Sequence, residues 1–135
     1  MARRAAGEYE GSDLGAFLRR LAGEIEADRG ALEEIMDTLG TSRDRLKVAG
    51  AWVGEKVGRL KLNGELLHSS PLSPLVELEV LLLGVHGKHA LWRTLRELED
   101  DRLDAARLAE LSERAERQAG ELEEHRRDAA TRAFA

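Results

Sequence analysis

Residues 13–39 read DLGAFLRRLAGEIEADRGALEEIMDTL, and this stretch decides the fold class. Apolar side chains recur in it every three or four residues, which is the spacing of one face of an α-helix. The apolar positions are Leu14, Phe17, Leu18, Leu21, Ile25, Leu32, Ile35, Met36 and Leu39. Ser12 or Asp13 can cap the start of this helix, and Gly40 can end it. The stretch therefore predicts a long amphipathic helix.

Two further helices are expected, one before and one after residue 70. The first covers about residues 41–62 and ends at Asn63-Gly64. The second opens at Ser73-Pro74, a capping residue followed by proline at the first helical position, and extends to about Leu98. The middle of this second helix is apolar on nearly every side, so we expect it to be the central helix.

A last helix is expected to begin near Asp101 or Asp104 and to reach the final few residues. Its solvent-facing side carries the i,i+4 pairs Glu110–Arg114, Glu113–Arg117 and Glu123–Arg127. No β pattern or internal repeat interrupts these segments. The sequence thus predicts an all-α chain, an antiparallel bundle of four main helices in one domain over residues 1–135. Residues 1–11 are expected to be flexible or partly helical.

Composition narrows the class of protein. Charged residues make up 35% of the 135 residues and apolar residues 42%, which is too apolar for a disordered chain. The chain has no cysteine, which excludes disulfides, thiolate metal ligands and thiol nucleophiles. Residues 1–11 lack the apolar stretch of a signal peptide, and the longest apolar run, Val80 to Leu83, is far too short to span a bilayer. We therefore expect a cytoplasmic protein.

Asp28 occupies a position on the first helix where a core residue is expected, between Ile25 and Leu32. Glu24 lies one turn earlier, on the flank of the same face. A carboxylate on an inward face is costly unless it is paired or binds a cation. Two alternatives follow: an ion pair with an arginine of a neighbouring helix, or a metal ligand.

The third expected helix carries a second candidate group. His86 and His89 share a face at i,i+3 spacing, and Glu79 lies two turns before His86. Imidazoles and carboxylates that converge inside a bundle can form a nitrogen–oxygen metal site. The alternative is one exposed histidine and one hydrogen-bonded core histidine. Gln118 and His125 raise the same question, because both are polar residues on the inward line of the last helix.

The expected helix over residues 41–62 is basic, with a local charge of +4. It also carries Gly50, Gly54 and Gly58 at a four-residue period, which indicates close approach of another backbone. A basic face can bind anionic lipid or nucleic acid. The net charge of −5 and the lack of a nucleic-acid-binding motif favour an acidic partner helix instead.

Three stretches resemble small bacterial ferritin-like proteins, actinobacterial ones among them. They are RAAGEYEGSDLG at residues 4–15 with the helix that follows, WVGEKVGRLKLNG at 52–64, and LSPLVELE at 72–79. The resemblance implies a ferritin-like four-helix bundle. It also implies that residues 2–8 are the tail of an opening helix whose body is absent, followed by a loop.

The chain departs from that superfamily at its di-metal signature, E-x-x-H inside two long helices. The one E-x-x-H in the chain is Glu65 to His68, in the expected loop. His86 and His125 are preceded three residues earlier by leucines. Ferroxidase chemistry is therefore assigned to no residue, since a shared fold does not carry function.

The sequence favours a non-catalytic, self-associating helical protein, a homodimer formed through apolar helix faces. No phosphate loop, nucleophile elbow or H-E-x-x-H motif is present. One alternative is a divergent ferritin-like protein that binds iron or manganese through some of Glu24, Asp28, Glu79, His86 and His89. Another is contact with anionic lipid or nucleic acid through the basic helix 41–62.

Overall fold

The computed structural model describes residues 2–40 and 72–134 of the chain. These residues form three α-helices: α1 (Ala2–Leu39), α3 (Leu72–Glu97) and α4 (Ala105–Phe134). The all-α class is confirmed, since no strand occurs in the described ranges. Four main helices are not confirmed, because the helix expected at 41–62 lies outside them.

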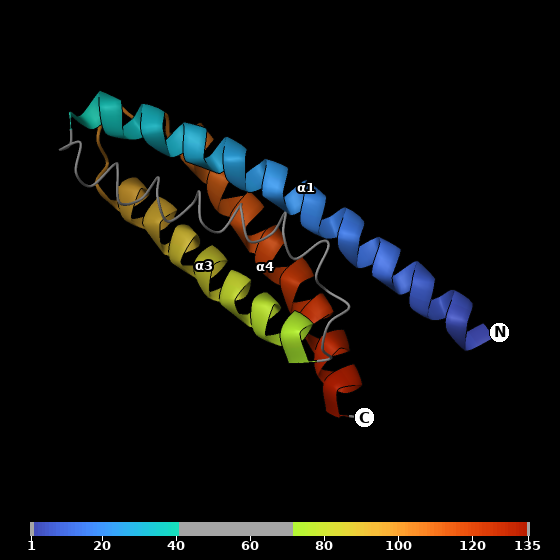
Figure 1. Ribbon diagram of the computed structural model, residues 1–135. Coiled ribbons are helices and arrows are strands. Elements are labelled where there is room, and N and C mark those ends of the chain that lie inside the picture. Colours follow the sequence, from blue (N-terminus) through green and yellow to red (C-terminus); the bar gives the residue numbers. More distant parts are fainter. Residues whose placement is uncertain (1, 41–71, 135) are drawn as a thin grey trace.

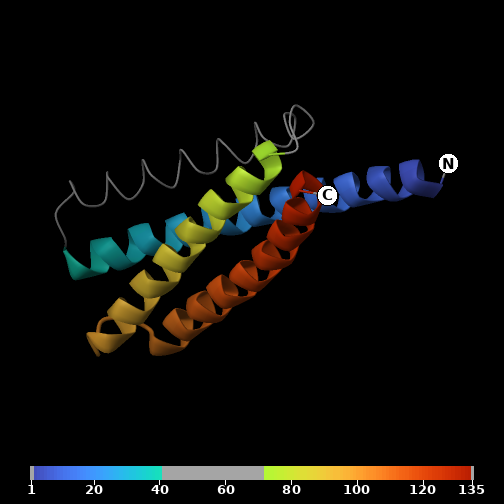
Figure 2. The ribbon, with the colours of Figure 1, turned by 90° about the horizontal axis from the view of Figure 1, so that it is seen from below.

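Helices α3 and α4 form an antiparallel hairpin, and α1 lies across one side of it (Figures 1 and 2). The backbones of α3 and α4 lie close together, whereas α1 approaches the hairpin backbone at few points. Ion pairs between α1 and α4 show their relative direction. Residue numbers rise along α1 and fall along α4 from the pair Arg20–Glu121 to the pair Glu34–Arg107. Helix α1 therefore runs antiparallel to α4 and in the same direction as α3.

One apolar core joins the three helices. On α1 it contains Phe17, Leu18, Leu21, Ile25, Leu32 and Ile35; on α3 Leu75, Leu78, Leu81, Val85, Trp92 and Leu95; and on α4 Leu108, Leu111, Ala115, Leu122 and Ala129. These positions recur at three- and four-residue spacing, so the apolar face predicted for residues 13–39 is the buried face. Trp92 and Leu122 are almost completely enclosed.

The helix ends confirm two predicted signals and correct a third. Gly40 follows α1 with a φ of 65°, the left-handed conformation that favours glycine at a helix C-terminus. Asp104 caps α4 by accepting hydrogen bonds from the Ala106 and Arg107 amides at 3.0 and 3.2 Å. The predicted start of the first helix at Ser12 or Asp13 is wrong, because α1 is continuous from Ala2.

The N-terminal part of α1 projects beyond the hairpin in both views (Figures 1 and 2). Residues 2–8 and residues 13–39 belong to one helix of 38 residues. The loop that the ferritin-like resemblance implies between them is therefore absent. No helix in the described ranges is both long and apolar enough to cross a membrane.

Candidate functional site

Asp28 lies at the centre of a charged cluster inside the fold, with only 3% of its surface exposed. Its Oδ1 accepts a hydrogen bond from Arg114 Nε of α4 at 2.9 Å and a second one from Arg114 Nη2. Its Oδ2 accepts one from Lys88 Nζ of α3 at 2.7 Å. One carboxylate of α1 is thus neutralised by cations from both other helices.

Gln118 and Glu24 extend this cluster along the interface between α1 and α4. The Gln118 side chain, 1% exposed, accepts from Lys88 Nζ and donates from Nε2 to Glu24 Oε1 at 3.0 Å. Arg117 Nη2 donates to both Glu24 oxygens at 3.0 Å. We call Glu24, Asp28, Lys88, Arg114, Arg117 and Gln118 the core charge cluster.

Two groups of the core charge cluster have shifted pKa values. Burial lowers the pKa of Lys88, and the neighbouring Asp28 carboxylate offsets only part of that effect. Burial alone would raise the pKa of Glu24. The hydrogen bonds from Gln118 and Arg117 outweigh burial, so the pKa of Glu24 lies below its ordinary value.

The geometry of the core charge cluster suits helix positioning better than chemistry. The Asp28 oxygens are occupied by Lys88 and Arg114, and Glu24 is occupied by Arg117 and Gln118. Removing one partner of such a buried pair is costly, because the other charge stays buried without a partner. The cluster therefore specifies the position of α1 on the hairpin. It offers a substrate no free nucleophile or general base.

The five candidate metal ligands do not converge. Asp28 and Glu24 are bound to the cations of the core charge cluster, while Glu79 and His86 are exposed on α3. His89 Nε2 lies 3.4 Å from Glu116 Oε1. Within the described residues, no group of three or more His, Asp or Glu side chains is arranged to hold a metal ion. Asp28 faces an arginine, not His86 and His89.

Gln118 and His125, the polar residues predicted on the inward line of α4, differ in burial. Gln118 belongs to the core charge cluster, whereas His125 is half-buried about two turns further along α4. The His125 ring stacks on Phe17 with centroids 4.5 Å apart. The Arg20 guanidinium lies 5.5 Å from the same Phe17 ring centroid. His125 thus packs against α1.

The sequence reasoning missed the cations of the core charge cluster. Arg114 and Arg117 were expected to pair with Glu110 and Glu113 on the solvent-facing side of α4, but they reach across to α1. The third expected pair, Glu123–Arg127, is confirmed at 3.3 Å. The inward position of Lys88 could have been predicted from the sequence, because Lys88 lies at core spacing between Val85 and Trp92.

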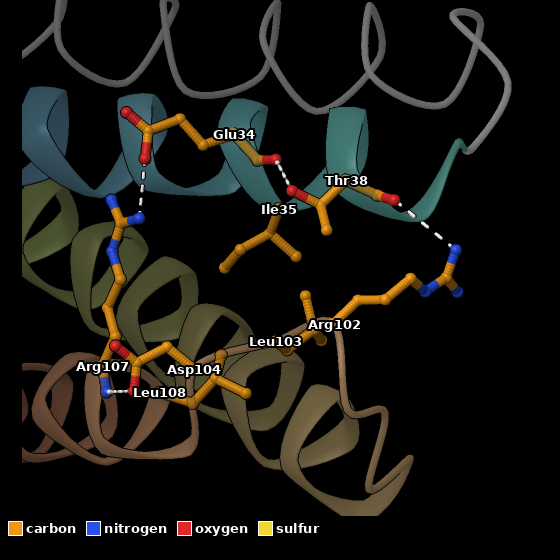
Figure 3. Close-up of a pocket in the computed structure, with 8 residues that line it drawn as sticks. All are labelled: Glu34, Ile35, Thr38, Arg102, Leu103, Asp104, Arg107 and Leu108. Atoms are coloured by element: carbon orange, nitrogen blue, oxygen red, sulfur yellow. Dashed lines mark hydrogen bonds and ion pairs between the residues drawn. The ribbon is translucent and has the colours of Figure 1, made fainter.

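A small pocket of about 160 Å³ lies where α1 ends beside the loop between α3 and α4 (Figure 3). Arg107 Nη1 bridges to Glu34 Oε2 at 2.6 Å, and Arg102 Nη1 donates to the Thr38 carbonyl at 3.5 Å. Ile35, Leu103 and Leu108 provide the apolar lining. Both arginines are already held by protein oxygens, so the pocket presents no unpaired cation to a ligand.

The face of α3 that points away from the core is apolar as well. Leu83 is 73% exposed and Val76 is 53% exposed. The helix was expected to be central because its middle is apolar on nearly every side, but these two positions face away from the core. We call this line the outer stripe: Val76, Val80, Leu83, Gly87, Ala90 and Thr94. Its members are exposed except Val80, which is half-buried.

Several predicted features lie outside the described residues. They are the basic helix 41–62 with its glycines Gly50, Gly54 and Gly58, and the Glu65 to His68 motif. Comparison of the chain with protein-family models, with curated proteins and with solved structures gives no match.

Proposed function

We propose that this chain is a non-catalytic, self-associating protein whose outer stripe on α3 binds a second copy of the same chain. The single observation that carries the proposal is the exposure of Leu83 and Val76 on the helix face opposite the core. An isolated exposed leucine is ordinary, but exposed apolar side chains that share one helix face with small residues are typical of a helix–helix interface.

The spacing of the outer stripe supports a helical partner. Its residues follow one another at intervals of four and three, the a and d positions of a heptad repeat. Such a line on one helix packs against a similar line on another. The opposite face of α3, with Leu78, Val85 and Trp92, is already used by the core. Helix α3 therefore has two apolar faces and one of them is available.

Gly87 gives a second reason for close packing at the outer stripe. A Cβ placed on Gly87 would contact nothing within 4 Å, so the residue is not needed for packing inside the monomer. A mid-helix glycine costs roughly 1 kcal/mol relative to alanine. The same holds for Gly120 of α4, but Gly87 alone of the two lies on the outer stripe, where the proposed partner helix can pack closely against it.

The proposal is tested by the mass of the full chain in solution. We expect a dimer at tens of micromolar in light scattering and sedimentation equilibrium, and a monomer for L83E. Burial of a leucine stabilises by roughly 1.5–3 kcal/mol, and a two-fold dimer contains the change twice. The dissociation constant of L83E should therefore rise by at least about 100-fold.

The chain offers a matched control in Leu98, a second exposed leucine (57%) outside α3 and the outer stripe. L98E should remain dimeric, and A90E, on the outer stripe, should be monomeric. All three variants should keep the helical circular dichroism of the unmodified chain. A monomeric unmodified chain, or a dimeric L83E, contradicts the proposal. Loss of helix in both L83E and A90E also contradicts it, because this chain itself would then cover the outer stripe.

A further inference from the structure

We infer that the two copies join with their α3 helices antiparallel about a two-fold axis, so that each Leu83 packs over Gly87 of the second copy. This inference rests on the proposed function and adds the orientation and register of the partner. It is carried by two properties of the helix surface: the order of side-chain sizes along the outer stripe, and the charges beside it.

Side-chain size changes along the outer stripe. Its N-terminal half contains the larger residues Val76, Val80 and Leu83, whereas its C-terminal half contains the small residues Gly87 and Ala90 before Thr94. A parallel pair would place large opposite large at one end and small opposite small at the other. The helices would then be forced apart at one end and leave a gap at the other, against the close packing that interfaces need.

An antiparallel pair makes the spacing even. With Leu83 opposite Gly87 of the second copy, Val80 falls opposite Ala90 and Val76 falls opposite Thr94. The Leu83–Gly87 and Val80–Ala90 layers then each combine one larger and one smaller side chain, and the outermost layer pairs Val76 with Thr94 of similar size. Because the contacts are reciprocal, each of these layers occurs twice, as a closed two-fold dimer requires.

Charges on the flank of the outer stripe point to the same arrangement. Glu79 and Arg93 lie two heptads apart on one side of it, and both are exposed. Neither makes an ion pair within the described part of the chain, although Glu79 lies near enough to Arg126 of α4 to help Glu123 raise the pKa of that guanidinium. In the antiparallel register Glu79 lies beside Arg93 of the second copy at both ends of the interface. In a parallel two-fold pair, this flank of one helix lies on the opposite side of the interface from the same flank of the other, so Glu79 and Arg93 would not meet.

The remaining residue of this flank, His86, lies halfway between Glu79 and Arg93. In the antiparallel register, His86 of one chain therefore lies beside His86 of the second copy, near the two-fold axis. Exposed ion pairs add little affinity, but these pairs form only in the antiparallel arrangement and therefore favour it. The charge pattern thus supports the orientation that side-chain size indicates, while the apolar residues supply the binding free energy.

Cysteine cross-linking tests the orientation, since the full-length chain has no cysteine of its own. In the antiparallel dimer, V76C faces T94C of the second copy. The two V76C positions lie about 27 Å apart along the helix axis, because a helix rises about 1.5 Å per residue. A short bifunctional thiol reagent should therefore cross-link an equimolar mixture of V76C and T94C chains. It should leave each variant alone largely uncross-linked.

The cross-linked product should disappear when L83E is added to both chains, which ties it to the outer stripe. A charge exchange gives an independent readout. R93E should weaken dimerisation by about three- to tenfold, and E79R/R93E should restore it. In a parallel dimer residues 79 and 93 do not meet, so R93E alone would leave dimerisation nearly unchanged and the double exchange would have nothing to restore.

The outcomes separate the inference from the proposed function. A dimer in which V76C alone and T94C alone cross-link efficiently is parallel, which overturns the inference and leaves self-association intact. A dimer in which neither variant nor the mixture cross-links uses another face, which overturns both. A monomeric unmodified chain overturns the proposed function itself.

Discussion

At the scale of single residues, Asp28 shows how a polar side chain is accommodated in an apolar helix face. Its carboxylate is almost completely buried, and Arg114 and Lys88 satisfy its two oxygens from different helices. The position was recognisable in the sequence because it interrupts an apolar line. Its partners were not, because they come from segments 60 and 86 residues away.

D28N should destabilise the fold by about 3 kcal/mol, because it keeps the size of the side chain but leaves two cations facing a neutral amide. K88M should cost less than D28N, about 1–2 kcal/mol, which is the loss of one donor to Asp28 Oδ2 and to the buried Gln118 oxygen. Burial already penalises the Lys88 ammonium and lowers its pKa, Arg114 still neutralises Asp28, and methionine has a similar length. Urea unfolding at pH 7, followed by circular dichroism, measures both. Equal losses in the two variants would show that Asp28 does not hold the cluster together.

At the scale of helices, the predicted apolar spacing describes the buried faces of α1 and α4 well. The predicted ends were less accurate. Asp104 caps α4, as the sequence indicated, but Ser12 and Asp13 lie inside α1. A capping residue defines a start only where the preceding backbone leaves the helical conformation. The stretch before Ser12, with Arg4, Ala5 and Ala6, contains good helix formers that let α1 continue.

Two glycines should respond in opposite directions to the same substitution. Gly120 lies in the interior of α4, and a Cβ there would contact nothing within 4 Å. G120A should therefore stabilise the fold by up to about 1 kcal/mol through helix propensity. Gly40 has a φ of 65°, so G40A should destabilise it by about 1 kcal/mol. Thermal unfolding of the two variants under identical conditions compares them, and a shift of the same sign would contradict this interpretation.

At the scale of the whole molecule, side-chain ion pairs join α1 to α4 along the length of the hairpin. They link Arg20 to Glu121, Glu24 to Arg117, Asp28 to Arg114, and Glu34 to Arg107. Long arginine side chains suit this interface, because the backbones of α1 and α4 approach closely at few points. Attachment of α1 should therefore depend on charge more than the pairing of α3 with α4 does.

Acid should weaken this attachment in part through Glu24. Its pKa in the folded chain lies below the ordinary value of 4.5, so it contributes stability that is present above pH 4.5. That contribution is lost as the pH falls from 4.5 through the lower folded value. E24Q should therefore show a shallower loss of stability below pH 4.5 in urea unfolding. E26Q, at an exposed position of α1, is the matched control and should follow the unmodified chain.

The sequence by itself determined the helical class, the buried faces and the position of Asp28 as an exception on one of them. These features depend on residues a few positions apart, whose spacing is set by the geometry of a single helix. The prediction of four helices includes one at residues 41–62, outside the described residues, and therefore stays a prediction.

Only the tertiary structure decided which cations meet Asp28, that Arg114 and Arg117 cross to α1, and that α3 leaves the outer stripe uncovered by the core. From the sequence alone, the outer stripe of α3 would be expected to be buried. Periodicity shows which residues share a helix face but not what that face contacts. Partners of an ion pair and the exposure of a face depend on the relative placement of helices far apart in the chain. For this protein, that placement distinguishes a paired core carboxylate from a ligand and exposes the surface proposed to bind a second copy.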